Sequence, residues 1–169
     1  MKIRIKIPNR QLDAIRVDLH RPHAFAHERV GFLTAGVMLS DEGEITLLAR
    51  AYEPVADCDY VPDPSVGVKI GGDAMRKALQ LAYTPRSALL HIHTHGGWGR
   101  PSFSGVDLRS GNAYVPGFFH AVSRMPHGML VLSDDSASGL VWLRASEQGV
   151  PVSEFIGVGS PYRRFGVQP

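Results

Sequence analysis

The chain has 169 residues, a length typical of one domain and too short for two full-sized enzyme domains. Hydrophobic residues make up 44% of it and charged residues 20%, a balance that is typical of globular proteins and excludes a disordered chain. Its 18 Lys and Arg residues against 16 Asp and Glu residues leave a formal net charge of +2, without a long run of like charges. We therefore predict one domain over residues 1–169 and no nucleic-acid partner.

Cysteine usage and the N-terminal sequence indicate the compartment. Cys58 is the single cysteine, so the chain can form neither an intramolecular disulfide nor a zinc site built on CxxC pairs. Residues 1–7 alternate isoleucine with charged residues and lack the apolar run of a signal peptide, and no later stretch is apolar enough for a transmembrane helix. We predict a soluble, cytoplasmic protein without a membrane partner.

The first third of the chain predicts mainly strands. Residues 2–7 alternate β-branched and charged side chains, which is typical of a half-buried strand. Residues 13–20 show no clear period, and a short helix is expected over 22–28, with proline in its first turn. Residues 30–39 and 44–55 are apolar runs joined by a Gly-containing turn, so they predict a β-hairpin.

A long loop, a helix and a strand are expected next. Residues 56–72 contain prolines, glycines and aspartates without a period, and a loop of this length often serves a function. Residues 73–83 have apolar side chains at helical spacing, with Asp73 as the candidate cap. Residues 87–95 begin as an apolar run and end in alternating histidines, which predicts a central strand whose far end reaches a site.

The remaining elements complete the expected fold. A glycine-rich loop over residues 96–103 leads to a helix that Ser104 would cap, and Gly111 and Pro116 are expected to keep this helix short. Further strands are expected over residues 118–123, 129–133, 140–145 and 154–158. The sequence therefore predicts an α/β (α+β) fold with one mixed β-sheet flanked by helices.

The histidines at the end of the expected central strand point to metal chemistry. A strand sends residues i and i+2 to the same face, so His93 and His95 can bind one ion together. Asp107, at the start of the next helix, is the candidate third ligand if the glycine-rich loop folds back. Two imidazoles and a carboxylate suit Zn²⁺, and a water in the fourth position would make the site catalytic.

These residues resemble a known family. His93-x-His95 followed by Ser104-x-x-Asp107 resembles the signature of the JAMM (JAB/MPN+) metallopeptidases. Upstream, Glu28-x-x-Gly31-x-Leu33 resembles the glutamate element of the same family. The resemblance covers the order of elements from about residue 24 to residue 108, and it implies a single JAB/MPN-like domain.

The resemblance also implies a role for each residue. His93, His95 and Asp107 would hold one zinc ion per chain with a catalytic water. Glu28 would take a proton from that water and pass it to the leaving amine, and Ser104 would hydrogen-bond the oxyanion. Two departures from the family pattern affect the serine: eight residues separate His95 from Ser104 where seven are usual, and the residue after His95 is glycine where proline is common. Ser104 also fits the N-cap of a helix, and the two roles are compatible.

The family further implies a substrate and partners. The chain looks similar to stand-alone bacterial JAB proteins, which process or deconjugate ubiquitin-like proteins and are often encoded beside E1-like and E2-like enzymes, including those of antiphage systems. It would cleave a peptide or isopeptide bond just after the C-terminus of a ubiquitin-like protein, with loop 56–72 and Trp98 contacting the substrate tail. Two alternatives are a non-catalytic MPN-type interaction module and a RadC-like, DNA-associated JAB protein, which the near-neutral charge disfavours.

The other histidines are not expected to bind a metal ion. His91 shares the strand face of the pair and is expected to be buried or to lie beside the ligands. His20, His23 and His27 are expected to form a solvated cluster near the site entrance, because no glutamate follows His23 as an HExxH zinc motif requires.

Overall fold

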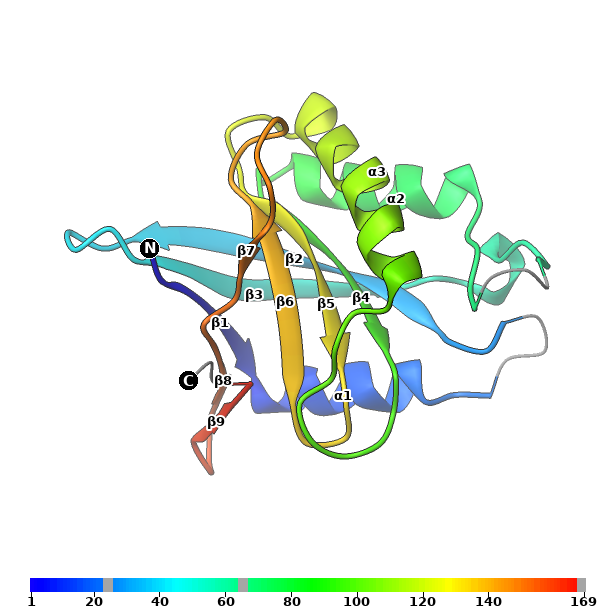
Figure 1. Cartoon of the computed structure of the whole chain (residues 1–169), viewed down its shortest axis with the longest axis horizontal. Helices are drawn as coiled ribbons and strands as arrows, with labels where there is room; N and C mark the ends of the chain where they lie inside the picture. The colour runs from blue at the N-terminus through cyan, green and yellow to red at the C-terminus, as the bar shows by residue number, and fades with distance from the viewer. Residues whose placement is uncertain (23–25, 64–66, 167–169) are drawn as a thin grey trace.

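The computed structural model describes residues 1–22, 26–63 and 67–166, and within them one curled sheet carries all nine strands (Figure 1). The helices are α1 (Asn9–Leu19), α2 (Gly72–Tyr83) and α3 (Gly105–Ala121), with a 3-10 turn at Asp57–Asp59. The strands are β1 (Ile3–Pro8), β2 (Val30–Leu39), β3 (Ile45–Pro54), β4 (Ala88–Thr94), β5 (His127–Leu132), β6 (Ala137–Trp142), β7 (Val150–Pro151), β8 (Glu154–Val158) and β9 (Arg163–Phe165). The predicted fold class, a mixed sheet with helices, is confirmed.

The sheet combines parallel and antiparallel pairs. Its strand order is β7-β6-β5-β4-β2-β3-β1-β8-β9. β1 runs parallel to β3 and β8, and β4 runs parallel to β5, while the other neighbours are antiparallel. β4 and β5 are parallel, so the chain must return to the same end of the sheet between them. α3 lies in this crossover connection. This crossover starts just beyond the carboxyl end of β4, where the histidines lie.

Helices cover both faces of the sheet, and each face has its own core. α1 lies on one side and α2 and α3 on the other (Figure 1). The first core packs Leu12, Ile15 and Leu19 of α1 against inward-facing residues of the central strands. The second packs small residues of α2, with Val115 and Phe118 of α3, against the opposite face. Along the described ranges, no helix combines the length and apolarity needed to cross a membrane.

Several predicted elements are confirmed. The strands expected over residues 2–7, 30–39, 44–55, 87–95 and 154–158 correspond to β1, β2, β3, β4 and β8, and the helix expected over 73–83 is α2. The N-cap of α2 is Gly71, however, and Asp73 lies in the first turn. β2 and β3 pair antiparallel, as a hairpin requires.

Other predicted elements were wrong. α1 occupies a segment in which no period was recognised, and the described residues between 22 and 28 are not helical. α3 continues through Gly111 and Pro116 for 17 residues and takes up most of the strand expected over 118–123. Tertiary packing outweighs the weak helix propensity here, because Val115 and Phe118 are buried on the face that α3 turns to the sheet. Gly111 allows the close approach: a Cβ there would lie 2.1 Å from the sulfur of Met129.

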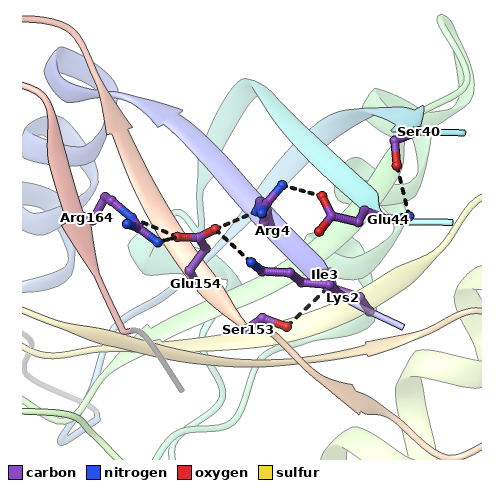
Figure 2. A network of polar contacts seen from close by, with 8 residues as sticks. All are labelled: Lys2, Ile3, Arg4, Ser40, Glu44, Ser153, Glu154 and Arg164. Atoms are coloured by element: carbon purple, nitrogen blue, oxygen red, sulfur yellow. Dashed lines mark hydrogen bonds and ion pairs between the residues drawn. The ribbon is translucent and has the colours of Figure 1, made fainter. Parts of the chain in front are cut away.

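An ion-pair network joins the N-terminal strand to the last two strands (Figure 2). The carboxylate of Glu154 on β8 accepts hydrogen bonds from Arg4 on β1 and Arg164 on β9, and Lys2 lies 3.8 Å away. The Glu154 side chain is only 4% exposed. Burial raises the pKa of this carboxyl, but the bonds from Arg164 and Arg4 outweigh that effect and hold the pKa below its usual value. The network therefore stabilises this edge of the sheet with Glu154 ionised.

Candidate metal centre

The alternation of β4 directs its histidines toward α2 and α3. Leu90 and Ile92 belong to the core beneath α1, whereas Leu89 belongs to the opposite core, so the odd-numbered residues face α2 and α3. His93 lies in the centre of the sheet, opposite Val30 of β2 and Val131 of β5. His95 follows just after the strand ends. The site is thus at the carboxyl end of a central strand, not on an edge strand.

The start of α3 brings Asp107 to these histidines. The Ser104 hydroxyl oxygen accepts a hydrogen bond from the Asp107 backbone N–H at 3.1 Å, and the Asp107 carboxylate accepts one from the Ser104 N–H at 2.7 Å. This capping box determines the direction of the carboxylate. Burial raises the pKa of Asp107, but hydrogen bonds from His93 and Ser104 outweigh it and hold the pKa far below its usual value. The Asp107 side chain is therefore a carboxylate at neutral pH.

The donor atoms of three ligand candidates lie close together, with one Asp107 oxygen near each histidine. His93 Nε2 lies 3.2 Å from His95 Nε2 and 3.5 Å from Asp107 Oδ1, and His95 Nε2 lies 3.3 Å from Asp107 Oδ2. Ligands about 2.0–2.1 Å from a tetrahedral zinc ion are about 3.3 Å apart. The donor set and its spacing therefore fit Zn²⁺, while the role of these residues as zinc ligands stays a prediction.

Glu28 reaches the same point from far earlier in the chain. Its Oε1 lies 3.9 Å from His95 Nε2, and the ligand atoms of Glu28, His93 and His95 all lie within 4.8 Å of one another. A carboxylate at this distance is placed to exchange a proton with a water held beside the histidines. The residues that the sequence pattern joined thus meet in space.

Arg29 positions the segment that carries Glu28, and sequence reasoning missed it. The Arg29 guanidinium is buried; it donates to the backbone carbonyls of Arg21 and Pro22 at 2.9 and 3.0 Å and to Asp57 at 2.8 Å. The His27 backbone N–H donates to the Gly67 carbonyl at 2.9 Å, which joins this segment to loop 56–72. A lone arginine beside a glutamate carries no sequence signal for such a role, because its carbonyl partners can be recognised only after folding.

The glycine-rich loop presents Trp98 to solvent from a fixed position. The Gly97 carbonyl accepts from the Asp134 N–H at 2.8 Å, and the Gly99 N–H donates to the Asp135 carboxylate at 2.7 Å. Gly97 and Gly99 have φ values of 70° and 86°, which other residues rarely adopt. The Trp98 side chain is 82% exposed. An exposed indole between two bonded residues is suited to contact a ligand.

A cavity of about 270 Å³ opens directly beside the candidate ligands. Glu28, His93, Ser104 and Asp107 line one part of it. Its other walls carry mostly apolar side chains from β2, loop 56–72, α2, α3 and β5. His91 also lines it, packed 5.1 Å from the Tyr114 ring, and burial together with neighbouring His93 lowers the pKa of His91 to about 3. His91 is therefore a neutral wall residue, as its place beside the pair predicted.

The upstream histidines differ in their surroundings. His20 bonds the Arg16 carbonyl through Nδ1 and the Asp134 carboxylate through Nε2, at 2.7 and 3.0 Å. His27 is exposed, and His23 lies outside the described residues. The cluster expected for these three residues thus stays a prediction.

Comparisons with known proteins do not identify this chain. No family model matches it, and no curated protein matches it. Among solved structures, the N-terminal domain of Trichoplax adhaerens STIL is similar over 78% of this chain, with 13% identity and a TM-score of 0.37. This chain spans only 38% of that structure, and a TM-score this low carries no conclusion about fold or function.

Proposed function

We propose that the chain is a zinc-dependent peptidase or isopeptidase of the JAMM type that cleaves just after the C-terminus of a ubiquitin-like protein. The observation that carries the proposal is the close approach of His93, His95 and the Asp107 carboxylate, with Glu28 beside them. A bound zinc would supply Lewis acidity and an activated water. The substrate class comes from the family resemblance, and the site geometry supports amide hydrolysis as the reaction.

The position of each side chain in the site indicates its proposed role. His93, His95 and Asp107 would hold the ion, because their donor atoms face one another at 3.2–3.5 Å. Glu28 Oε1 would accept a proton from the attacking water and return it to the leaving amine. The Ser104 hydroxyl accepts from the Asp107 N–H with its oxygen, so its proton remains available to donate to the substrate oxygen.

The test combines metal analysis with a cleavage assay. The purified chain should contain one zinc, and it should cleave a fusion of a ubiquitin-like protein to a reporter. Glu28→Gln should keep the zinc and reduce the turnover rate by a factor of about 10²–10⁴, because it removes only the proton acceptor. His95→Ala should lose the zinc as well as the turnover. His120→Ala, at an exposed position near the end of α3, is the matched control and should change neither.

Two results would contradict the proposal. If the chain binds no zinc at pH 7, either as purified or after dialysis against zinc, the proposed metal centre is wrong. A Glu28→Gln variant with wild-type turnover leaves the centre in place but removes Glu28 as the base.

A further inference from the structure

We infer that the cavity beside the candidate metal centre is a specificity pocket for a large apolar side chain adjoining the scissile bond. This inference rests on the proposed function and deepens it, because it predicts what the substrate carries at the cut. Glu28, His93, Ser104 and Asp107 border the cavity, so a substrate with its carbonyl at the centre has a neighbouring side chain within reach of it.

The lining determines the kind of side chain. Apart from the site residues, the walls include Val30, Val68, Ile70, Met75, Tyr114 and Met129. Burying an apolar group against these walls is favourable, whereas a charged group buried against them would lose its hydration. The carboxylates of Glu28 and Asp107 belong to the part of the cavity at the candidate metal centre and not to these walls. Leucine, methionine and phenylalanine therefore suit the pocket, and lysine with a free ammonium group does not.

The volume is sufficient for such a group. An apolar cavity of about 150 Å³ accommodates benzene. The cavity here measures about 270 Å³, so it can hold a phenyl or isobutyl group and still leave room at the metal centre. Glycine on both sides of the scissile bond would leave it unfilled. The pocket therefore predicts a substrate in which one flanking residue is large and apolar.

Two positions on α3 offer a matched pair of variants. Ser110 is exposed and lines the cavity, so Ser110→Phe would fill it from the helix surface. Asn112 is exposed two residues further along and is not among the lining residues described, so Asn112→Phe adds the same ring elsewhere. Met75 lines both this cavity and a second groove between α2 and the end of α3, so Met75→Ala would enlarge the pocket.

The first experiment measures kcat/KM for peptides that differ only at the residue before or after the scissile bond. At one of these positions, leucine and phenylalanine should exceed glycine about tenfold or more, because they bury a whole apolar side chain. Lysine should not exceed glycine. Ser110→Phe should reduce the phenylalanine-to-glycine ratio toward one, Asn112→Phe should preserve it, and Met75→Ala should shift the preference toward tryptophan.

A second measurement does not depend on turnover. Calorimetry on the zinc-loaded chain compares acetohydroxamate with 3-phenylpropanohydroxamate, which share the chelating group and differ in the apolar tail. The phenyl compound should bind about tenfold tighter or more, and Ser110→Phe should remove most of that difference.

The outcomes distinguish a failure of this inference from a failure of the proposed peptidase function. Equal rates for glycine and large apolar residues at both positions, with equal hydroxamate affinities, would overturn the pocket and leave the peptidase intact. A phenyl preference in binding, without hydrolysis of any peptide or of a ubiquitin-like fusion, would support the pocket and overturn the peptidase.

Discussion

Ser104 has a capping role and a proposed catalytic role, which substitution can separate. Its hydroxyl oxygen accepts one hydrogen bond from the Asp107 N–H, while the reciprocal bond from the Ser104 backbone to the Asp107 carboxylate does not depend on the side chain. Ser104→Ala therefore loses one of the two bonds of the capping box, which should cost about 1 kcal/mol of folding free energy. For a chain of this size that lowers the Tm by about 2–4 °C.

Ser104→Gly isolates the proposed catalytic role. Glycine is an acceptable N-cap, so this variant should lose only a few tenths of a kcal/mol. It lacks the hydroxyl as completely as alanine does. If the Ser104 hydroxyl stabilises the oxyanion, kcat should fall by a factor of about 10²–10³ in both the alanine and the glycine variant, with zinc retained. Ser104→Thr should keep most of the activity.

Thermal denaturation, zinc content and kcat measured on the same four proteins test this reasoning. Equal losses of kcat in the alanine and glycine variants, with unequal losses of stability, are expected. A zinc-loaded Ser104→Gly variant with wild-type kcat would refute the catalytic role and leave Ser104 as a cap alone.

Three further predictions concern stability and the substrate. Glu154→Gln should cost about 1.5–3 kcal/mol at pH 7, since it removes the charge that Arg4 and Arg164 bond. The pKa of Glu154 is lowered on folding, so this stability is present above the ordinary glutamate pKa of 4.5 and is lost as the pH falls through the lower folded value. Urea denaturation of both proteins should therefore converge in acid, and a constant difference would contradict the ionic account. Gly128→Ala should lower the free energy of unfolding by about 1–3 kcal/mol, because its Cβ would lie 2.3 Å from the Leu140 carbonyl oxygen. Gly117→Ala lies in α3 with open space around its Cβ, so it should stabilise the protein by up to about 1 kcal/mol. A loss of stability in the Gly117 variant would contradict this packing. Trp98→Ala should change stability by less than about 0.5 kcal/mol, because the indole is exposed, and should raise KM for the ubiquitin-like fusion; an unchanged KM removes Trp98 from the substrate site.

Patterns of short range predicted much of the site. The alternation of a strand placed His93 and His95 on one face, and the spacing of Ser104 and Asp107 is that of a capping box, which the structure contains. α1 was missed although Leu12, Ile15 and Leu19 follow a helical spacing, because Val17 interrupts that stripe with an exposed apolar residue.

Contacts between distant segments explain the other differences. Gly111 was expected to shorten α3, but its missing side chain lets the helix approach Met129, and this packing is invisible before β5 is in place. Arg29 has no local partner that would mark it as important. Its role arises when Arg21 and Pro22, which follow α1, and Asp57 of the 3-10 turn meet around its guanidinium.

The sequence by itself predicted the two parts of the candidate donor set, a histidine pair at strand spacing and Asp107 at helix-cap spacing, because each part depends only on backbone periodicity over a few residues. Only the tertiary structure decided that Asp107 and Glu28 reach the two histidines and that an apolar cavity borders them. Those relations depend on side chains that meet across the sheet, and no local rule of spacing determines where such side chains lie.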